Sequence, residues 1–539
     1  MIQRSVVIGL DGVTWRILDP LIEGGHMPHL ASLRARGAWG VLESTVPTYT
    51  PPAWTSAITG VNPGRHGIYG FIEGHAQNER RELVHSGRIE APTIWEMAKA
   101  QGLRAGVYNV PLTYPPRALD GWMVSGMMTP GWGERQRGFT SWDKGSADLE
   151  ARILKWVPDY AVDMSADWER DWRDAALAEQ ALAILQQRHT VLDRLIQLDP
   201  PDLLFTVLET PDRLQHVYFR YLDPADSLYN TEAGRKLRPQ VIACYEAMDR
   251  IVGMLDDYAG GGGALVCSDH GFTAWESSVH TNTLLQQWGY LKLKAGARLM
   301  QTSAARKAVP LAKRVLPARV AREAKNRTFA AVDWSRTRAF ASPIPQQGVY
   351  INLKGRERLG VVEPGELQAL KEAIKRNFEE LNGPDGQPVT DRVHLAEDVF
   401  EGDALDGAPD LLPVMRDHRF ELDDELFHKQ PITDLSHLPR GVHHPDGIVV
   451  LRGPGVKQTS ELRGSVMDVT PTMLYLGDFA IPDGLDGSVL ADAFDRAAIS
   501  NRPPRSTAPP TSGPRDEGSP YSEDEEKQIE ESLRGLGYI

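Results

Sequence analysis

The chain has 539 residues, of which 41% are hydrophobic and 24% charged, a balance typical of a globular protein long enough to bury a large core. Its 59 Lys and Arg residues against 73 Asp and Glu residues give a formal charge of −14, which argues against a general nucleic-acid binder. Two cysteines, Cys244 and Cys267, are too few for a disulfide framework or a four-thiolate zinc site.

The first residues carry too few apolar side chains before Asp11 to form the hydrophobic region of a signal peptide. No later stretch reaches the roughly 18 apolar residues of a membrane helix. The sequence therefore predicts a cytoplasmic protein that starts near Met1.

Short apolar segments alternate with segments of helical periodicity along the chain. Continuous apolar runs of this length are typical of strands that are buried on both faces. The sequence therefore predicts an α/β fold with a mostly parallel central sheet and helices on both faces. The predicted strands lie at residues 6–10, 105–108, 203–208, 264–267 and 448–451.

Three segments interrupt this pattern and divide the predicted domain at 1–498 into a core (about 1–130, 200–290 and 335–498) and insertions. Residues 131–199 are rich in Trp and charge and predict an inserted helical cap. A second insertion is expected at 291–334. Residues 499–520 hold six prolines and predict a disordered linker. Residues 521–539 predict a short acidic helix with a capping box at Ser522 and a stop at Gly535.

The second insertion is strongly basic between Lys292 and Arg327, with eleven Lys or Arg residues against one acid, Glu323. We favour a solvated helical insertion near the mouth of the site. The alternative is peripheral contact with a membrane of anionic lipids or with a polyanionic substrate, which Pro310 and Pro317 disfavour because they break the helical pattern. The acidic helix could dock on this segment or bind a partner, and the sequence does not choose between them.

Polar residues directly follow several of the predicted strands. Asp11 follows the first, Glu209 and Asp212 the third, and Asp269 with His270 the fourth. Ligands bind beyond the carboxyl ends of strands in open α/β sheets, so we expect these side chains to converge.

Two further histidines complete a set of candidate metal ligands. Asp212 and His216 are four residues apart on a predicted helix, so both lie on one face, although a solvated helix face would look the same. His443 precedes another buried strand, where a simple loop histidine is the alternative. With Asp269 and His270, these residues offer oxygen and nitrogen ligands for two divalent ions and no thiolate.

Residues 47–60 predict a helix with Thr50 at the N-cap, Pro51 in the first turn and Gly60 at its end. A phosphoryl group at this helix start would meet free N–H groups and the helix dipole. The Thr50 hydroxyl is then a candidate nucleophile, provided that a metal lowers its pKa. The alternative is a plain capped helix.

Together these segments resemble the type I phosphodiesterase/nucleotide pyrophosphatase branch of the alkaline phosphatase superfamily. The resemblance covers about residues 1–125, 200–290 and 335–498, and residues 467–472 are similar to the superfamily's closing core helix. It is carried by Gly9–Gly12, Thr50 with the run Thr59–Ile68, Pro211–Asp212 with His216, Ser268–Gly271, and Gly441–His443.

The resemblance implies two divalent ions, with Zn²⁺ expected and Mn²⁺ as the alternative. Asp11, Thr50, Asp269 and His270 would hold one ion, and Asp212, His216 and His443 the other. It further implies that a small phosphate-ester substrate, with a phosphodiester or pyrophosphate bond, is hydrolysed through a phosphothreonine on Thr50.

Three positions test this resemblance. Phe71 stands where an asparagine helps to bind a phosphoryl oxygen in nucleotide pyrophosphatases, which leaves nucleotide specificity open. Cys267 lies in Cys-Ser-Asp-His rather than in the Cys-x-Pro-x-Arg of formylglycine sulfatases. Ser56 falls almost two turns into the helix and ranks below Thr50 as a nucleophile.

Two alternative functions stay open from the sequence. The first keeps the site but hydrolyses phosphate monoesters or acts as a phosphomutase. The second is a metal-binding scaffold with little turnover. Diesters are favoured over monoesters because no third cluster of acids and histidines offers an extra cation for the additional charge, and Arg65 is expected to be structural.

Overall fold

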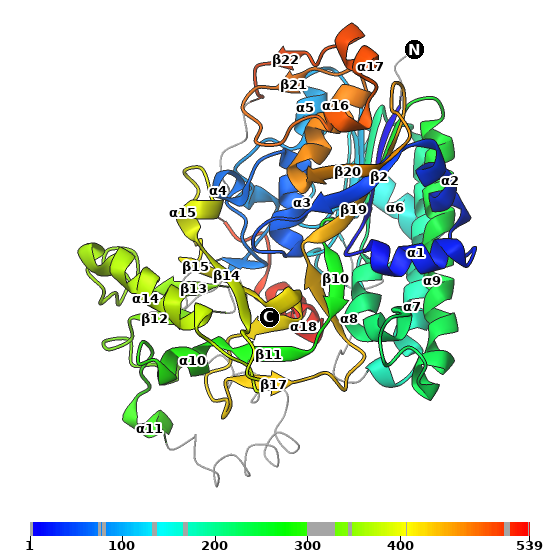
Figure 1. Cartoon of the computed structure of the whole chain (residues 1–539). Helices are drawn as coiled ribbons and strands as arrows, with labels where there is room; N and C mark the ends of the chain where they lie inside the picture. Colours follow the sequence, from blue (N-terminus) through cyan, green and yellow to red (C-terminus); the bar gives the residue numbers. More distant parts are fainter. Residues whose placement is uncertain are drawn as a thin grey trace.

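The computed structural model describes residues 4–73, 77, 82–131, 137–164, 171–298, 329–342, 348–405, 407–510, 518–536 and 538. A nine-stranded mixed sheet crosses the molecule (Figure 1). Its strands β19 and β7 run antiparallel to their neighbours, and the other neighbouring strands are parallel. In order across the sheet they are β20 (Thr459–Ser465), β2 (Ala38–Glu43), β19 (Asp446–Arg452), β9 (Gly263–Cys267), β1 (Ser5–Leu10), β8 (Leu203–Leu208), β5 (Ala105–Tyr108), β6 (Gly121–Val124) and β7 (Thr140–Trp142).

Helices cover both faces of this sheet, as the continuous apolar runs predict. Every residue of β1 and β8 is buried, and all five predicted strands belong to the sheet. The predicted α/β class is confirmed. On one side lie α9 (Glu232–Ala259), α2 (Pro28–Arg36) and α7 (Ala176–Leu198), and on the other α3 (Thr50–Thr59), α5 (Ile94–Lys99) and α16 (Val469–Leu476).

Residues 277–434 build two smaller sheets with a hydrophobic core of their own. Ile351, Ile374 and Leu411 are fully buried in that core. The first sheet holds β11 (Ser277–His280), β16 (Phe420–Asp423) and β17 (Ile432–Asp434), and the second β12 (Ala339–Ala341), β13 (Val349–Ile351), β15 (Leu411–Met415) and β14 (Thr390–Leu395). The helices of this region are α10 (Thr281–Gln287), α11 (Ala295–Arg298), α14 (Leu367–Glu379) and α15 (Ala396–Val399).

This arrangement differs from the predicted division of the domain. The segment from residue 335 was expected to belong to the core, but its strands up to residue 434 join the smaller sheets instead. An apolar run predicts a strand but does not show which sheet that strand joins. The expected cap at 131–199 contributes the edge strand β7, the helix α6 (Ser146–Trp156) and α7, which packs on α9. Most of the basic segment at 292–327 lies outside the described residues.

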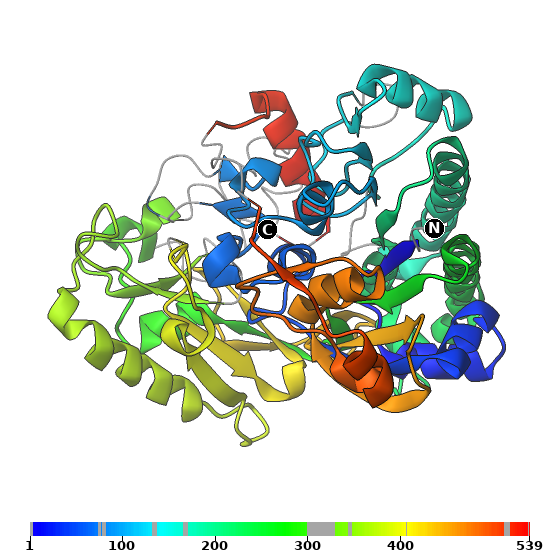
Figure 2. The same cartoon turned by 90° about the horizontal axis from the view of Figure 1, so that it is seen from above.

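The acidic helix forms as α18 (Glu523–Gly535), with the predicted capping box. The Ser522 N–H donates to Glu525 Oε2 at 2.7 Å, and the Glu525 N–H donates to Ser522 Oγ at 3.4 Å. Its buried face, with Ile529 and Leu533, lies against residues 127–131, near the segments that follow β5 and β6 (Figure 2). The helix thus docks on the core of the same chain.

The remaining helices and strands are short or belong to the site described below. They are α1 (Trp15–Glu23), α4 (Pro63–His66), α8 (Thr210–Leu222), α17 (Arg496–Asn501), β3 (Ile72–Glu73), β4 (Glu82–Leu83), β10 (Gly271–Ala274), β18 (Gly441–His444), β21 (Ile481–Pro482) and β22 (Ser506–Thr507). Because β21 pairs with β22 and α17 is helical, the predicted linker is ordered over part of its length, and residues 511–517 fall outside the description.

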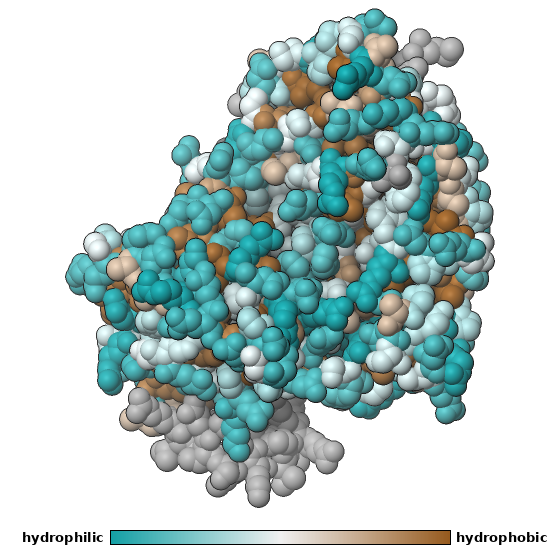
Figure 3. Space-filling model, in the orientation of Figure 1, coloured by the Kyte–Doolittle hydropathy of each residue, from teal (hydrophilic) through white to brown (hydrophobic). Residues whose placement is uncertain are grey.

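The surface is mainly hydrophilic on the face shown in Figure 3, where hydrophobic residues form small separate groups. Within the described parts of the chain, no helix combines the length and apolar character needed to cross a membrane.

A buried ion pair joins α7 to the end of β8. Arg188 is fully buried, and its Nη2 lies 2.7 Å from Oε1 of Glu209. The guanidinium also donates to the carbonyl oxygens of Ala161 and Val162, and Asn109 donates to the Glu209 carboxylate. Glu209 is therefore a structural residue rather than a member of the expected strand-end cluster.

We expect Glu209→Ala to lower the free energy of unfolding by about 3–5 kcal/mol, because it leaves the Arg188 guanidinium charged and unpaired in the interior. Urea denaturation measures the effect. The double variant Arg188→Met/Glu209→Leu should lose less than Glu209→Ala alone, since no buried charge remains. Additive losses in the double variant would contradict this coupling.

Candidate active site

The candidate site lies where β8, β1 and β9 end. These three strands are parallel neighbours with β1 in the middle, so the residues that follow them meet at one edge of the sheet. His270 Nε2 lies 3.3 Å from Asp269 Oδ2, 3.7 Å from Asp11 Oδ1 and 4.0 Å from Asp212 Oδ1. Residues that are more than 250 positions apart in sequence thus share one buried cluster, as the strand pattern predicts.

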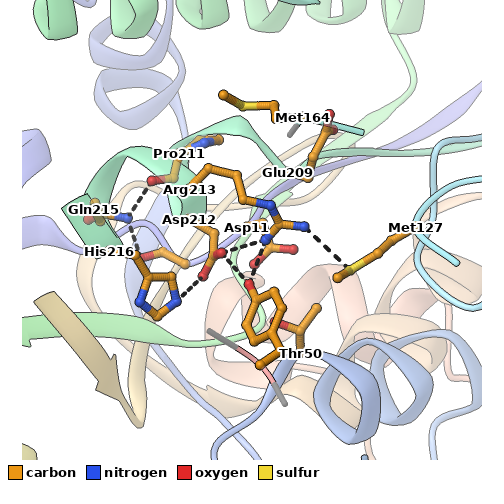
Figure 4. Close-up of polar contacts among 12 residues, drawn as sticks. Asp11, Thr50, Met127, Met164, Glu209, Pro211, Asp212, Arg213, Gln215 and His216 are labelled. Carbon is orange, nitrogen blue, oxygen red and sulfur yellow. Dashed lines mark hydrogen bonds and ion pairs between the residues drawn. The ribbon is translucent and has the colours of Figure 1, made fainter. Parts of the chain in front are cut away.

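A second group overlaps the first at Asp212. Asp212 and His216 project from one face of α8 (Figure 4), and Asp212 Oδ1 lies 3.3 Å from His216 Nε2 and 3.4 Å from His443 Nε2. The two imidazole nitrogens of His216 and His443 are 2.9 Å apart. The antiparallel pair β10 and β18 brings His443 into the group, in register with Phe272.

Thr50 lies at the start of α3, near Asp11 and Asp212 (Figure 4). Its Oγ1 is 3.3 Å from His270 Nε2, and the residue is fully buried. The helix begins at Thr50 itself and Tyr49 is the N-cap, one residue earlier than predicted. Gly60 ends the helix in the left-handed conformation with φ 72°, as expected for glycine there.

The start of α3 offers fewer N–H groups to an anion than the sequence analysis assumed. Pro51 and Pro52 carry no N–H. The Ala53 N–H donates to the Tyr49 carbonyl oxygen at 3.1 Å. In the first turn, at most the Thr50 N–H can therefore donate a hydrogen bond to a phosphoryl oxygen. Other groups have to supply most of the attraction for that oxygen.

The three carboxylates of the site are oriented alike. In each of them one oxygen accepts a hydrogen bond from outside the cluster. The donors are Trp54 Nε1 for Asp11 (3.1 Å), the Gly12 N–H for Asp269 (3.2 Å) and Arg213 Nη1 for Asp212 (2.6 Å). The other oxygens, Asp11 Oδ1, Asp212 Oδ1 and Asp269 Oδ2, are buried and accept no hydrogen bond within the described residues.

These oxygens face the imidazole nitrogens of the cluster. Buried carboxylate oxygens without donors are costly unless a cation or a proton compensates them. Carboxylate and imidazole are also the ligands that Zn²⁺ and Mn²⁺ take in proteins. The donor set and its orientation therefore fit divalent cations.

Burial and mutual repulsion shape the titration of these groups. Burial, followed by repulsion from Asp212, raises the pKa of Asp269 to about 8, and burial also raises the pKa of Asp11 well above its ordinary value. For Asp212, burial is outweighed by His216 and His443, so its pKa falls well below the ordinary value. Burial lowers the pKa of His216 to about 4. The ionised forms of Asp11 and Asp269 are therefore disfavoured on their own, and a bound cation would stabilise them.

Two further residues contact the cluster and were not predicted from the sequence, Arg213 and Tyr538. Arg213 is fully buried next to Asp212, and its Nη2 also lies 3.0 Å from Asp163 Oδ2. The Tyr538 hydroxyl reaches the same carboxylate from the far end of the chain. Adjacency to Asp212 was a usable signal for Arg213, whereas nothing local points to Tyr538.

Three residues discussed as possible site residues, Ser56, Arg65 and Phe71, make other contacts in the structure. Ser56 Oγ lies 3.0 Å from His66 Nε2, and Arg65 binds Asp486 at 2.8 Å, so both are structural. Phe71 is buried, and its ring lies 5.3 Å from the Tyr49 ring and 4.9 Å from the Tyr538 ring. At the position where nucleotide pyrophosphatases are expected to carry an asparagine, this chain therefore has an aromatic ring packed against two others, which we call the aromatic wall (Tyr49, Phe71 and Tyr538).

A cavity of about 80 Å³ adjoins this site on the side of His443. Its lining comes from both the main sheet region and the smaller sheets, and includes Thr48, His443, Glu421, Arg392 and His394. Burial raises the pKa of the Glu421 carboxyl to about 7.

Comparison with solved structures shows that this fold is shared with known proteins. Phosphonoacetate hydrolase from Sinorhizobium meliloti 1021 is similar in its complexes with phosphonoacetate (TM-score 0.55, 17% identity) and phosphonoformate (TM-score 0.54, 16% identity). Each match covers 88% of this chain and 96% of that one. Murine ectonucleotide pyrophosphatase/phosphodiesterase 5 matches with a TM-score of 0.47 and 14% identity over 92% of this chain and 100% of that one.

The chain belongs to the type I phosphodiesterase/nucleotide pyrophosphatase family, whose model matches residues 5–425. Membership of this family makes the chain a phosphoester hydrolase. The family assignment that the sequence motifs suggested is confirmed.

We expect a divalent cation such as Zn²⁺ to stabilise the folded protein, by about 2.7 kcal/mol when its concentration is 100 times the dissociation constant. Differential scanning calorimetry before and after chelation measures this. His443→Ala should bind more weakly than His444→Ala, a matched control on the same strand whose side chain points to the opposite face, where its ring lies 5.0 Å from that of His418. Equal effects of the two substitutions would contradict the site.

Proposed function

We propose that the chain is a two-metal phosphohydrolase that cleaves phosphodiester or pyrophosphate bonds of small phosphate esters, with Thr50 as the nucleophile. The observation that carries this proposal is the position of Thr50 Oγ1, 3.3 Å from His270 Nε2 and buried in a cluster of carboxylates and imidazoles. A lone hydroxyl at a helix start would not be reactive, but a hydroxyl beside such a cluster can be.

Seven residues would hold the ions, in two adjacent groups. The first consists of Asp11, Thr50, Asp269 and His270, and the second of Asp212, His216 and His443. His270 lies between the groups, since its Nε2 is within 4.0 Å of carboxylate oxygens from both and its ring centroid is 3.9 Å from that of His443. Zn²⁺ is the metal we expect, with Mn²⁺ as the alternative.

When bound, divalent ions neutralise charge on the phosphoryl oxygens and lower the pKa of hydroxyl groups and water in contact with them. Thr50 Oγ1 then attacks phosphorus in line with the leaving oxygen, so that a Thr50 O–P bond forms while the bond to the leaving group breaks. Water attacks the phosphothreonine in the second step, which releases phosphate or a phosphate ester and restores the hydroxyl. Burial of Thr50 keeps bulk water away from the first step.

Phosphate monoesters are the second candidate substrates, and Arg213 is the observation that favours them. Its guanidinium is a fixed positive charge beside Asp212, which could compensate the extra charge of a monoester. However, its N–H groups already donate to Asp212, Asp163 and Tyr538, so the carboxylates of Asp212 and Asp163 neutralise the guanidinium charge. This pairing leaves diesters as the preferred class. A scaffold without turnover would have no need for the nucleophile among the ligands.

Thr50→Ala should lower kcat by at least about 10³-fold, because it removes the attacking oxygen, whereas Thr50→Ser should retain activity. Turnover of a nitrophenyl diester measures both. Thr55→Ala is the control, since Thr55 is a buried threonine on the same helix whose hydroxyl donates to the Pro51 carbonyl oxygen at 2.7 Å. Wild-type turnover in Thr50→Ala would indicate direct attack by water and refute the covalent route.

Matched nitrophenyl mono- and diesters test the substrate class. We expect a higher kcat/KM for the diester, because the Arg213 guanidinium beside Asp212 is neutralised by Asp212 and Asp163. A monoester preference above about tenfold, roughly 1.4 kcal/mol of transition-state discrimination, would reverse the assignment.

A further inference from the structure

Residues 518–536 and 538 contribute side chains to the same hydrophobic core as the main sheet. Ile529, Leu533 and Leu536 are buried there. Tyr521 stacks on Tyr114, with ring centroids 5.5 Å apart, and its hydroxyl donates to the Met128 carbonyl oxygen at 3.1 Å. The segment therefore packs as a constituent of the domain, close to the carboxyl edge of the sheet (Figure 2).

Tyr538 is the residue of this segment that contacts the candidate site. Its hydroxyl donates to Asp212 Oδ2 at 2.5 Å and accepts a hydrogen bond from Arg213 Nη1 at 2.5 Å. Its own carbonyl oxygen accepts a hydrogen bond from the Tyr49 hydroxyl at 2.9 Å, and its ring lies 5.8 Å from that of His216. The side chain is thus fixed at both its main-chain end and its phenolic end.

We propose that Tyr538 is a positioning residue of the metal site. Its hydroxyl and the Arg213 guanidinium hold Oδ2 of Asp212, so that Oδ1 stays turned toward His216 and His443. The inference rests on the proposed function, in which Asp212 is a metal ligand. Groups that hold a ligating carboxylate from behind commonly set its orientation and the affinity of the metal.

The contact pattern distinguishes this role from that of an inhibitory plug. A plug that competed with a cation would contact Asp212 Oδ1, the oxygen that faces the imidazoles. Tyr538 instead contacts Oδ2 and leaves Oδ1 without a hydrogen bond among the described residues. Withdrawal of the tyrosine would also pull on α18, whose apolar side chains are buried in the main core.

Tyr538→Phe tests the proposal because it removes the hydroxyl and keeps the ring. Co²⁺ affinity, measured by competition with a chelator on the full chain, should weaken by about tenfold, and the visible spectrum of bound Co²⁺ should change. Tyr521→Phe is the matched control, a buried tyrosine of the same segment that contacts a carbonyl oxygen rather than a ligand. It should leave affinity and spectrum unchanged.

The outcomes separate this proposal from the function on which it rests. Wild-type protein that binds no Co²⁺ would overturn both. Wild-type binding with Tyr538→Phe indistinguishable from Tyr521→Phe would overturn the positioning role alone. A rise in kcat/KM for Tyr538→Phe would also overturn it, in favour of a plug. Should Tyr538→Phe not fold, Tyr49→Phe replaces it: weaker Co²⁺ binding in that variant supports the role, and unchanged binding contradicts it.

Discussion

Three carboxylates buried within one cluster are the constraint on which this structure depends. Asp11, Asp212 and Asp269 repel one another, and burial adds to the cost of their ionised forms. Part of that cost is offset by donors behind each carboxylate: Trp54 behind Asp11, the Gly12 N–H behind Asp269, and Arg213 with Tyr538 behind Asp212, of which only Arg213 is charged. The remaining oxygens point inward, toward the histidines. Residues as far apart as Trp54 and Tyr538 donate hydrogen bonds to these carboxylates and so stabilise their ionised forms.

Sheet topology explains how distant residues reach the cluster. Because β1 lies between β8 and β9, all three carboxylates lie just beyond the ends of adjacent parallel strands, at one edge of the sheet. Gly12 makes the turn after β1 possible: its φ is 70°, and a Cβ there would lie 2.6 Å from the Phe272 ring. His443 arrives by a different route, through the antiparallel pairing of β10 with β18, so the smaller sheets are tied to the site as well.

The parts that could be predicted from sequence are those with a local pattern. Apolar runs predicted the central strands, and the four-residue spacing of Asp212 and His216 predicted a shared helix face. Glu209 shows the limit, since as a strand-end acid it resembles Asp212, yet its partner Arg188 lies 21 residues earlier and no short motif marks that pair. The sheets of residues 277–434 escaped prediction for a similar reason, because strand partners there are far apart in sequence, as in the pair Ser277 and Asp434.

The aromatic residues around the site have a consequence for its chemistry. Tyr49, Phe71 and Tyr538 form edge-on and tilted contacts with one another, and Phe272 packs on His216 and His443. Rings in these positions exclude water, which lowers the local dielectric and strengthens both attraction to a cation and repulsion between the carboxylates. The same rings that raise the cost of ionised carboxylates on their own therefore also strengthen the attraction of these carboxylates for a cation. The Tyr538 ring packs on Tyr49 and Phe71, and its hydroxyl donates to Asp212. This one residue therefore links the exclusion of water to the orientation of a candidate ligand.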